Sequence, residues 1–533
     1  MTSSVASALK ERTESAQETQ EETTVMTARR PGRRAVMVSA VLTQLMIVLD
    51  LTIIAIALPR MQDDLGMTVS QSPWTVTGYS LAFGGLVLFG GRLCAVVGIR
   101  RSYQVGLIGF GVASLAAGMA TSFPILLVAR VAQGCFGALL APTSQSLLNV
   151  TFTERSERER VFAIFGATGG LGAAVGLLVG GALTDWFSWR WALYINILLA
   201  AAALLIGQRS LPPADQRDRG SRITDDLTGL VLGCGACFSA VYGLDRAQQT
   251  SWTSTSTVSW LALGGIAAVL FVVRERFANR PVLPLSMMAL PVRAASYATQ
   301  FIAGAGQMGA IIYLTYYMQN HFGYSPFKSG VVFLPMVLAL IATAIPAGRV
   351  IVPRLGARGT LPLGLAVLTG SFLIFSRMTT QSSYSQVALP GLIVFGIGLG
   401  LTMPVTFNSG TRGVDAKRTG LASAILSAAQ QIGGSFGVAL MTSYATQHAE
   451  DYVAEHSEEV RAAAMEAMMR AQALPQSPAG KQIIEALKAQ LVDRAQIEAY
   501  AGGFTMMAWI LAGAGAALVA CGITLSVRRR RTR

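Results

Sequence analysis

Apolar runs of about twenty residues, separated by short polar segments, follow one another along the chain from residue 36 onward. A helix needs about 20 consecutive apolar residues to cross the hydrocarbon core of a bilayer. Lipid offers no hydrogen-bond partners, and a helix is one of the few structures that pair all backbone N–H and C=O groups internally. The pattern therefore predicts an all-α integral membrane protein with about fourteen transmembrane helices. The predicted helices are residues 36–58, 74–93, 103–120, 123–148, 160–183, 191–210, 227–244, 258–273, 295–318, 329–350, 360–376, 387–407, 420–445 and 503–527.

The composition agrees with this interpretation. The chain is 52% hydrophobic and only 13% charged, whereas soluble domains carry about 25% charged residues. Its 55 glycines favour close packing of helices in lipid. In a soluble protein the net charge of +14 would suggest a nucleic-acid partner. In a membrane protein the positions of Lys and Arg set the topology instead, so we expect no nucleic-acid partner.

The basic clusters all lie on one side of the membrane if every predicted helix spans it. One cluster precedes the first helix, and the others follow every second helix. They occupy residues 29–34, 100–101, 155–160, 209–222, 274–280, 354–358, 412–418 and 528–531. Cytoplasmic loops carry the excess of Lys and Arg, so both termini are predicted to be cytoplasmic in a multi-pass protein of the cell membrane.

Five segments follow from the helix pattern and the loop composition. Residues 1–35 form a polar tail expected to be disordered and cytoplasmic, and 528–533 a basic cytoplasmic tail. Six-helix bundles are predicted at 36–211 and 281–527, with a linker and two extra helices at 212–280. The C-terminal bundle contains an acidic external loop, 446–502, in which Ile483, Leu487 and Leu491 have the spacing of an amphipathic helix. This loop is either a lid over the exit or a solvated surface hairpin.

Two charged residues fall deep inside predicted helices. Asp50 lies in the first helix and Arg130 in the fourth, both about 10–14 Å below the outer surface at 1.5 Å per residue. Charges inside the membrane are costly, and they commonly mark ion or substrate pathways. We predict that the two residues face each other and couple transport to protons, with Asp50 as the proton carrier. The alternative is a structural ion pair that only holds two helices together.

Uncharged polar side chains and glycines supply further candidates. Some glutamine and asparagine side chains inside predicted helices are expected to line a substrate cavity, and others to bond between helices. The cavity candidates are Gln44, Gln133, Asn196, Gln300, Gln307, Gln430 and Gln431. Gly172, Gly176 and Gly180, with Gly181, form a bare stripe on one helix face, which predicts close helix packing and is compatible with a sliding surface.

The sequence offers little support for other chemistry. It has no phosphate-cradling GxxxxGK[ST] motif and no metal-ligand cluster, so we expect no cofactor and no metal. Cys234 and Cys237 form a CxxC without a second ligand pair, and small apolar side chains in a helix are the simpler interpretation. A membrane-embedded enzyme or sensor would need a catalytic constellation or a soluble domain, and neither is evident.

Several motifs, in one order along the chain, resemble those of the fourteen-helix drug:proton antiporters of the major facilitator superfamily. In the N-terminal half they are Leu49-Asp50-Leu51-Thr52-Ile53 with Ala57-Leu58-Pro59, Trp74 with Gly78-Tyr79, Gly91-Arg92-Leu93 with Gly98 and Arg100-Arg101, Arg130 with Gln133-Gly134, Gly137-Ala138 and Pro142, Gly176 with Gly180-Gly181, and Trp189-Arg190-Trp191 with Asn196. In the C-terminal half they are Tyr324-Ser325-Pro326 with Gly330 and Pro335, and Gln430-Gln431-Ile432-Gly433.

The resemblance implies a major facilitator fold of two six-helix bundles plus two extra helices. It also implies proton-coupled export of small amphipathic organic compounds, such as antibiotics, by a monomer in the lipid bilayer, with the loop motif from Gly91 to Arg101 in gating. Three departures are present: Ala95 replaces the usual Asp of the loop motif, Leu177 the usual Pro of the antiporter motif, and Ala55 a common Asn. A facilitator or importer of a metabolite in the same superfamily remains the alternative.

Overall fold

The computed structural model describes residues 30–67, 71, 74–211, 227–278, 281, 283, 286–414, 419–470 and 478–531, and these ranges are almost entirely helical. Fourteen of the described helices have 13 residues or more. The all-α class and the count of about fourteen helices are therefore confirmed.

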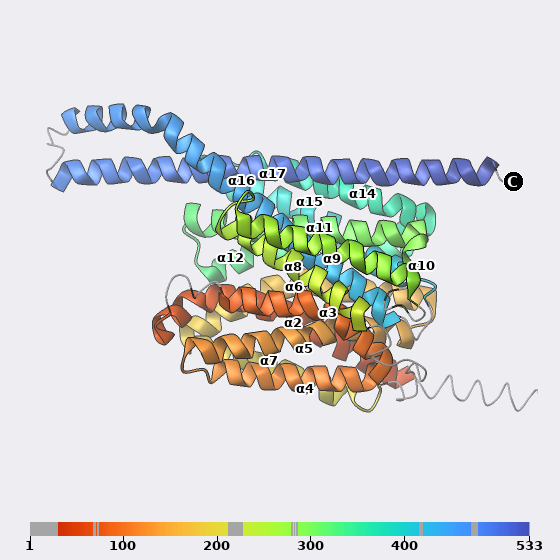
Figure 1. Ribbon diagram of the computed structural model, residues 1–533. Helices are drawn as coiled ribbons and strands as arrows, with labels where there is room; N and C mark the ends of the chain where they lie inside the picture. Colours follow the sequence, from red (N-terminus) through yellow and green to blue (C-terminus); the bar gives the residue numbers. More distant parts are fainter. Residues whose placement is uncertain are drawn as a thin grey trace, which may run out of the picture.

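Six helices form the N-terminal bundle, drawn from red to yellow in Figure 1. They are α2 (Arg30–Leu65), α3 (Trp74–Val97), α4 (Ile99–Gly118), α5 (Phe123–Thr151), α6 (Arg155–Trp186) and α7 (Trp189–Gly207). Within this bundle α5 packs against α3 and α4, and α2 packs against α6 and α7.

The C-terminal bundle lies beside it and is built from interrupted and long helices. Its elements are α10 (Ser286–Ala289), α11 (Pro291–Tyr316), η2 (Tyr317–His321), α12 (Pro326–Val332), α13 (Leu334–Pro346), η3 (Ala347–Ile351), α14 (Val352–Phe375), η4 (Tyr384–Ala388), α15 (Leu389–Thr411), α16 (Thr419–Arg470) and α17 (Pro478–Arg531). The sequence predicted one helix over 329–350, but the structure interrupts it at Phe333, just before Pro335 at the start of α13.

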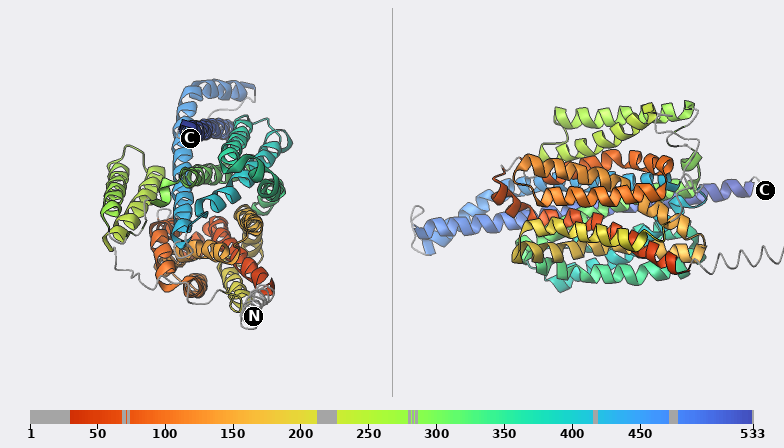
Figure 2. Two further views of the ribbon diagram at one scale, coloured as in Figure 1. Left: turned by 90° about the vertical axis from the view of Figure 1, so that its right-hand side faces the viewer. Right: turned by 90° about the horizontal axis from the view of Figure 1, so that it is seen from below.

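The two extra helices form a separate pair at one flank of the bundles. They are α8 (Leu227–Gln249) and α9 (Thr255–Phe277), and α8 packs on α3 and α16 while α9 packs on α8. The left view of Figure 2 shows this pair, in yellow-green, outside the two bundles. Many large hydrophobic residues of α9 are exposed, which suits contact with lipid.

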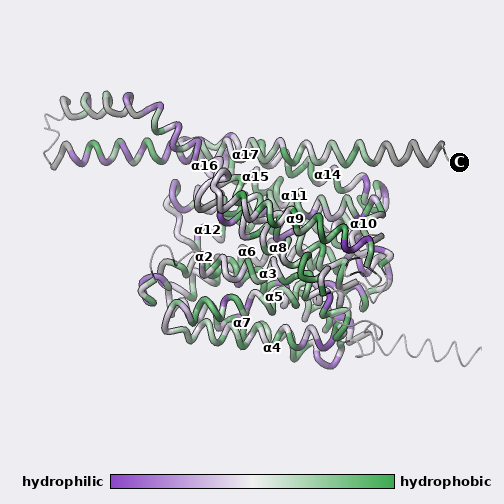
Figure 3. The backbone as a smooth tube through the Cα atoms, in the orientation of Figure 1, coloured by the Kyte–Doolittle hydropathy of each residue, from purple (hydrophilic) through white to green (hydrophobic). Residues whose placement is uncertain are grey.

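Ten segments of the described helices are long and apolar enough to cross a membrane, and one of them, 327–375, covers both α13 and α14. The remaining long helices are α4, α6 and α11. Figure 3 shows hydrophobic residues along the middle of the helices and hydrophilic residues mainly at the two ends of the bundle. The chain is a multi-pass membrane protein.

A short turn is repeated in the two halves. Gly98, between α3 and α4, has a φ of 97°, and Gly356, where α14 bends, has a φ of 66°. Both glycines follow a Gly-Arg pair by several residues, Gly91-Arg92 and Gly348-Arg349. A positive φ favours glycine because a Cβ would clash with the backbone, so the same local requirement explains this faint sequence repeat.

The segment 446–502 is more helical than the predicted external loop, and the helix predicted around Ile483, Leu487 and Leu491 lies within α17. α16 continues without a break to Arg470, and α17 begins at Pro478, so the described parts of this segment are two helical extensions rather than a loop. Figure 1 shows the resulting hairpin projecting beyond the bundle. Charged residues in the sequence marked the end of the apolar run, but a helix does not have to end where it leaves the membrane.

The first described helix begins at the same end of the bundle at which α17 ends (Figures 1 and 2). An even number of crossings has this consequence. The projecting hairpin lies at the opposite end of the bundle (Figure 1).

Candidate functional site

The two deep charges predicted from the sequence lie in direct contact. Nη1 of Arg130, on α5, lies 2.6 Å from Oδ2 of Asp50, on α2, and both side chains are 0% exposed. The sequence placed them at similar depth and suggested that they face each other across a cavity. In this structure no space separates them, and the pair is a buried ion pair.

Two amides complete the shell of the Asp50 carboxylate. Nδ2 of Asn196, on α7, donates to Oδ1 at 2.6 Å, and Nε2 of Gln133, on α5, donates to the same oxygen at 3.2 Å. Gln133 also donates to Oγ of Ser114, on α4, at 2.7 Å. Four helices of the N-terminal bundle therefore meet at one carboxylate.

Arg130 ties α3 to this cluster. Its Nε donates to the carbonyl oxygen of Thr75 at 3.0 Å, and its Nη1 also donates to Oε1 of Gln133 at 2.9 Å. The guanidinium carbon lies 4.6 Å from the ring centroid of Tyr79, which is a cation–π distance. Nη2 of Arg130 and Oδ1 of Asn196 are buried and have no hydrogen-bond partner among the described residues. We call Asp50, Arg130, Gln133, Asn196 and Ser114 the charge cluster.

The glycine stripe of α6 packs on the turns of α2 that carry Asp50. A Cβ at Gly172 would lie 3.0 Å from the Cβ of Val48, and one at Gly180 would lie 2.9 Å from Cγ1 of Ile53. A Cβ at Gly176 would overlap the side chain of Thr52. Glycine is thus required for this close approach, and the adjacent Gly181 is also buried. The side chains of Leu177 and Ala55, two of the departures from the family motifs, lie outside the described part of the structure.

The other predicted cavity residues are spread over the molecule. Gln300 is buried and accepts a hydrogen bond from Oγ1 of Thr406 at 2.6 Å, which joins α11 to α15. Gln307, on α11, is also buried. Gln44, Gln430 and Gln431 are partly buried on α2 and α16. No described hydrogen bond joins these five side chains to the charge cluster, so only Gln133 and Asn196 of the predicted set belong to it.

The residues of the loop motif lie at the end of α3 and the start of α4. Gly91 and Arg92 are buried, and Gly98 forms the turn. Nη2 of Arg100 approaches the carbonyl oxygen of Gln208 at 3.4 Å, while Arg101 is exposed. Ala95 is partly buried and offers no carboxylate at this end of the bundle.

Comparison with known proteins assigns the family. The sequence profile of the Major Facilitator Superfamily matches residues 40–438. The chain belongs to this superfamily. It is 40% identical to the puromycin resistance protein of Streptomyces alboniger over 78% of this chain and 82% of that protein. It is 33% identical to the cephamycin export protein of Amycolatopsis lactamdurans over 76% of this chain and 83% of that protein.

The fold comparison agrees. The crystal structure of the human organic anion transporter MFSD10 (TETRAN) superposes with a TM-score of 0.56 at 13% sequence identity, covering 90% of this chain and 99% of that one. At this identity the match supports the fold alone. Fold and family together identify the chain as a membrane transporter.

In this superfamily transporter the two bundles are in contact at the end where α2 begins. Nε of Arg158, on α6, donates to Oδ1 of Asn408, on α15, at 3.0 Å. Oγ1 of Thr411, also on α15, donates to Oδ1 of Asn149 on α5 at 3.2 Å. The ring of Phe407 lies 6.4 Å and 6.1 Å from the rings of Phe162 and Phe165. These contacts join the two bundles at this end, and α12 and α13 also pack on α6.

The sequence does not identify the residues that join the two bundles at this end. Arg158 is one residue of a basic cluster, and nothing in the sequence distinguishes Asn149 or Asn408 from other asparagines. Their common signal is a polar amide in the last turn or so of an otherwise apolar helix. That signal becomes specific only when both helix ends are known to meet.

A second ion pair joins the C-terminal end of α2 to the Trp189-Arg190-Trp191 motif at the start of α7. Nη1 of Arg190 lies 2.7 Å from Oδ2 of Asp64, and Nε1 of Trp189 donates to the same oxygen at 3.1 Å. Hydrogen bonds from Arg190 and then from Trp189 hold the pKa of the Asp64 carboxyl below its ordinary value. The Asp64 side chain is 46% exposed, so solvent screens the pair and its contribution to stability is small.

The cysteines show no sign of metal or redox chemistry in the described structure. Cys234 and Cys237 lie on α8 and pack with Leu88 of α3 and Ala424 of α16. Among the described residues, no three His, Cys, Asp or Glu side chains are placed to hold a metal ion.

Proposed function

We propose that this transporter exports small amphipathic organic compounds across the cell membrane in exchange for protons, and that Asp50 carries the proton. The observation that carries the proposal is the Asp50 carboxylate, which is 0% exposed and in contact with Arg130. The relatives named for puromycin resistance and cephamycin export support the direction and the class of substrate. One chain contains the whole charge cluster, which supports function as a monomer.

The exchange requires Asp50 to change its neutralising partner. In this conformation Arg130 supplies the compensating positive charge at 2.6 Å. If the N-terminal bundle rearranges, the guanidinium can move away from Asp50. The isolated Asp50 carboxylate inside the membrane is then unfavourable, and binding a proton neutralises it. Return of Arg130 would expel the proton. Arg130 is therefore the proposed competitor of the proton.

The incomplete hydrogen bonding of the cluster supports a functional role over a purely structural one. A buried ion pair stabilises a fold well only when its remaining donors and acceptors are also satisfied. Nη2 of Arg130 and Oδ1 of Asn196 lack partners among the described residues. An arrangement that leaves a guanidinium donor unmatched suits a pair that opens and closes, because the closed state is then not too stable.

The experiment that tests export is a resistance and accumulation screen in a bacterial strain that lacks its own exporters. Expression of the chain is expected to raise resistance to, and lower accumulation of, a subset of amphipathic compounds, with puromycin included as a probe. Collapse of the proton gradient should restore accumulation. Increased uptake of a compound along its gradient, unaffected by that collapse, would instead favour the facilitator or importer.

Cytoplasmic termini and an external hairpin between α16 and α17 are part of the proposal. Ser3→Cys and Ser477→Cys can be tested with a membrane-impermeant maleimide in intact cells, with the unsubstituted chain as the background. We expect labelling at position 477 and none at position 3, because the basic clusters place residue 3 inside. The reverse pattern would overturn the topology.

We also expect neutral or weakly acidic aromatic compounds to be exported better than divalent cations. Asp50 and Arg130 cancel each other's charge, and residues 291–414 contain no Asp or Glu at all. A dication at mid-membrane would need a second carboxylate, because an unpaired charge there costs several kcal/mol, about 3 or more. Lipophilic monocations that displace the proton from Asp50 form a weaker second group.

An efflux assay with matched aromatic compounds of charge zero, minus one, plus one and plus two measures this preference. Rapid export of the dication, together with exclusion of the neutral and acidic compounds, would contradict the expectation. A negative vestibule near the projecting hairpin would then have to supply the missing charge.

A further inference from the structure

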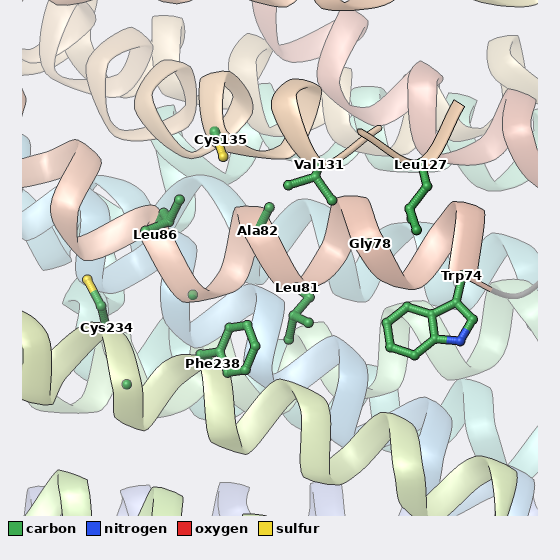
Figure 4. A pocket seen from close by; sticks show the side chains of 12 residues that line it. Trp74, Gly78, Leu81, Ala82, Leu86, Leu127, Val131, Cys135, Cys234 and Phe238 are labelled. Carbon is green, nitrogen blue, oxygen red and sulfur yellow. The ribbon is translucent and has the colours of Figure 1, made fainter. Parts of the chain in front are cut away.

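An apolar pocket of about 520 Å³ lies between α3, α5 and α8. Its lining includes Trp74, Leu81, Leu127, Cys135, Cys234 and Phe238. Figure 4 shows Trp74 at one end of the pocket and Leu86, Cys135 and Cys234 toward the other, with α3 between the side chains of α5 and α8. The predicted substrate-cavity residues are absent from its lining.

The pocket opens toward the lipid-facing surface of the protein. On α5, Val128 is 70% exposed and Val131, a lining residue, is 38% exposed. On α8, Val231 is 62% exposed and the lining residue Phe238 is 37% exposed. Large apolar side chains exposed on both flanks place the opening in the hydrocarbon region, since such exposure is normal only against lipid.

The long axis of the pocket runs from one membrane interface toward the middle. Trp74 is the first residue of α3, and Leu86 lies twelve residues further along that helix. At 1.5 Å per residue this distance is about 18 Å, whereas one leaflet of the hydrocarbon core is about 15 Å thick. Tryptophan at a helix end is typical of the interface, and the Trp74 ring contacts Tyr242 of α8 at 6.3 Å.

We propose that this pocket binds one acyl chain of a phospholipid from the leaflet at the Trp74 end. The volume lies in the range of ligand pockets, about 300–1,000 Å³. Among the described lining residues, the only polar side-chain groups are the indole N–H of Trp74 at one end and the thiols of Cys135 and Cys234. A compound with several hydrogen-bonding functions needs more placed polar groups than these, so a hydrocarbon chain fits the walls better than an exported amphipathic molecule. Two charged residues of α8 lie at the Trp74 end: Asp245 accepts a hydrogen bond from Thr77, and Arg246 lies over the ring of Tyr242. Because their charges are opposite, we expect no preference for an anionic or a cationic lipid headgroup.

The bound chain would give the extra helix pair a role. It would fill the space between α8, α3 and α5. Arg130 lies on α5, and α3 holds it through the Thr75 carbonyl and the Tyr79 ring. Thr75 and Tyr79 each follow a lining residue, Trp74 and Gly78, and lie on the neighbouring face of α3. The lipid is thus a packing element of the N-terminal bundle, separated from the charge cluster by the helix backbones.

Gly235 offers a direct test because it lines the pocket and a Cβ there would meet nothing within 4 Å. Gly235→Leu should fill the pocket from α8 without a clash. Gly265→Leu is the matched control, since Gly265 lies on the partner helix α9, also has nothing within 4 Å of a Cβ, and is not a lining residue. The probe is a phosphatidylcholine with a photoreactive diazirine near the middle of one acyl chain, incorporated into nanodiscs with the purified full chain.

Crosslinks mapped by mass spectrometry are expected on the α3, α5 and α8 segments that line the pocket in the unsubstituted chain and in Gly265→Leu. In Gly235→Leu they should fall by about tenfold, which corresponds to about 1.4 kcal/mol of binding free energy. Crosslinks that are absent from these segments, or equal in the two variants, would overturn the proposal. So would displacement of the probe by a compound found in the resistance screen, because the pocket would then be a substrate site.

A second measurement needs no substitution. Cys234 lines the pocket, whereas Cys521 of α17 is exposed. In detergent, added phospholipid should slow the reaction of Cys234 with a lipid-soluble maleimide and leave Cys521 unchanged. Equal slowing at both thiols, or none at Cys234, would contradict acyl-chain binding.

Discussion

We expect Asp50→Asn to abolish substrate accumulation driven by a pH difference. With the membrane potential held at zero, exchange of one proton for one neutral molecule across one pH unit can sustain an about tenfold concentration difference, or about 1.4 kcal/mol. Asparagine carries no proton, so the ratio in the variant should stay at about one. The measurement is the steady-state distribution of a neutral substrate in proteoliposomes.

Asp245→Asn is the matched control for this prediction. Asp245 lies near the end of α8, where its carboxylate accepts a hydrogen bond from Thr77 at 3.0 Å, away from the charge cluster. This variant should sustain the same concentration difference as the unsubstituted protein. An undiminished concentration difference in Asp50→Asn would remove Asp50 from the coupling mechanism.

The second large effect concerns stability. Arg130→Met should lower the free energy of unfolding by about 3–5 kcal/mol, because it leaves the buried Asp50 carboxylate without its compensating charge. The double variant Asp50→Asn/Arg130→Met removes both charges and should recover most of that loss, since replacing a buried ion pair by neutral side chains is often close to neutral. Denaturant unfolding of the purified protein in detergent measures all four members of the cycle.

This cycle also separates the two roles of the pair. If the double variant is stable but does not couple transport to protons, the pair serves coupling beyond its part in the fold. If instead the double variant is no more stable than Arg130→Met alone, the destabilisation arises from lost packing or from the Thr75 and Gln133 hydrogen bonds, and the ion pair is not its cause.

The sequence predicted the parts of this structure that depend on local pattern. Hydrophobic runs located the helices, since the length of a span is set by the bilayer. Asp50 and Arg130 lie at equal depth below the outer surface in two antiparallel helices, and this was enough to predict that they face each other.

Features that depend on helix rotation or on contacts between the bundles were not predictable. Asn196 and Gln133 were candidates, but so were Gln44 and Gln307, and periodicity alone does not say which polar face meets which neighbour. The Arg158–Asn408 contact joins residues 250 positions apart and requires the docking of the two bundles to be known. The sequence predicts a helix around Ile483, Leu487 and Leu491, and α17 contains it. The unbroken extension of α16 to Arg470 is not predictable from the charges after the apolar run, because leaving the membrane does not end a helix.

The most direct test of proton-coupled export is the movement of protons caused by a substrate. Proteoliposomes that contain the unsubstituted chain and a trapped pH-sensitive dye are given a neutral exported compound from outside, with no initial pH difference and the membrane potential held at zero. Entry of the compound should drive protons out, so the lumen should become alkaline, and Asp50→Asn should show no change. Entry of the compound into liposomes of the unsubstituted chain without any change in luminal pH would contradict the account.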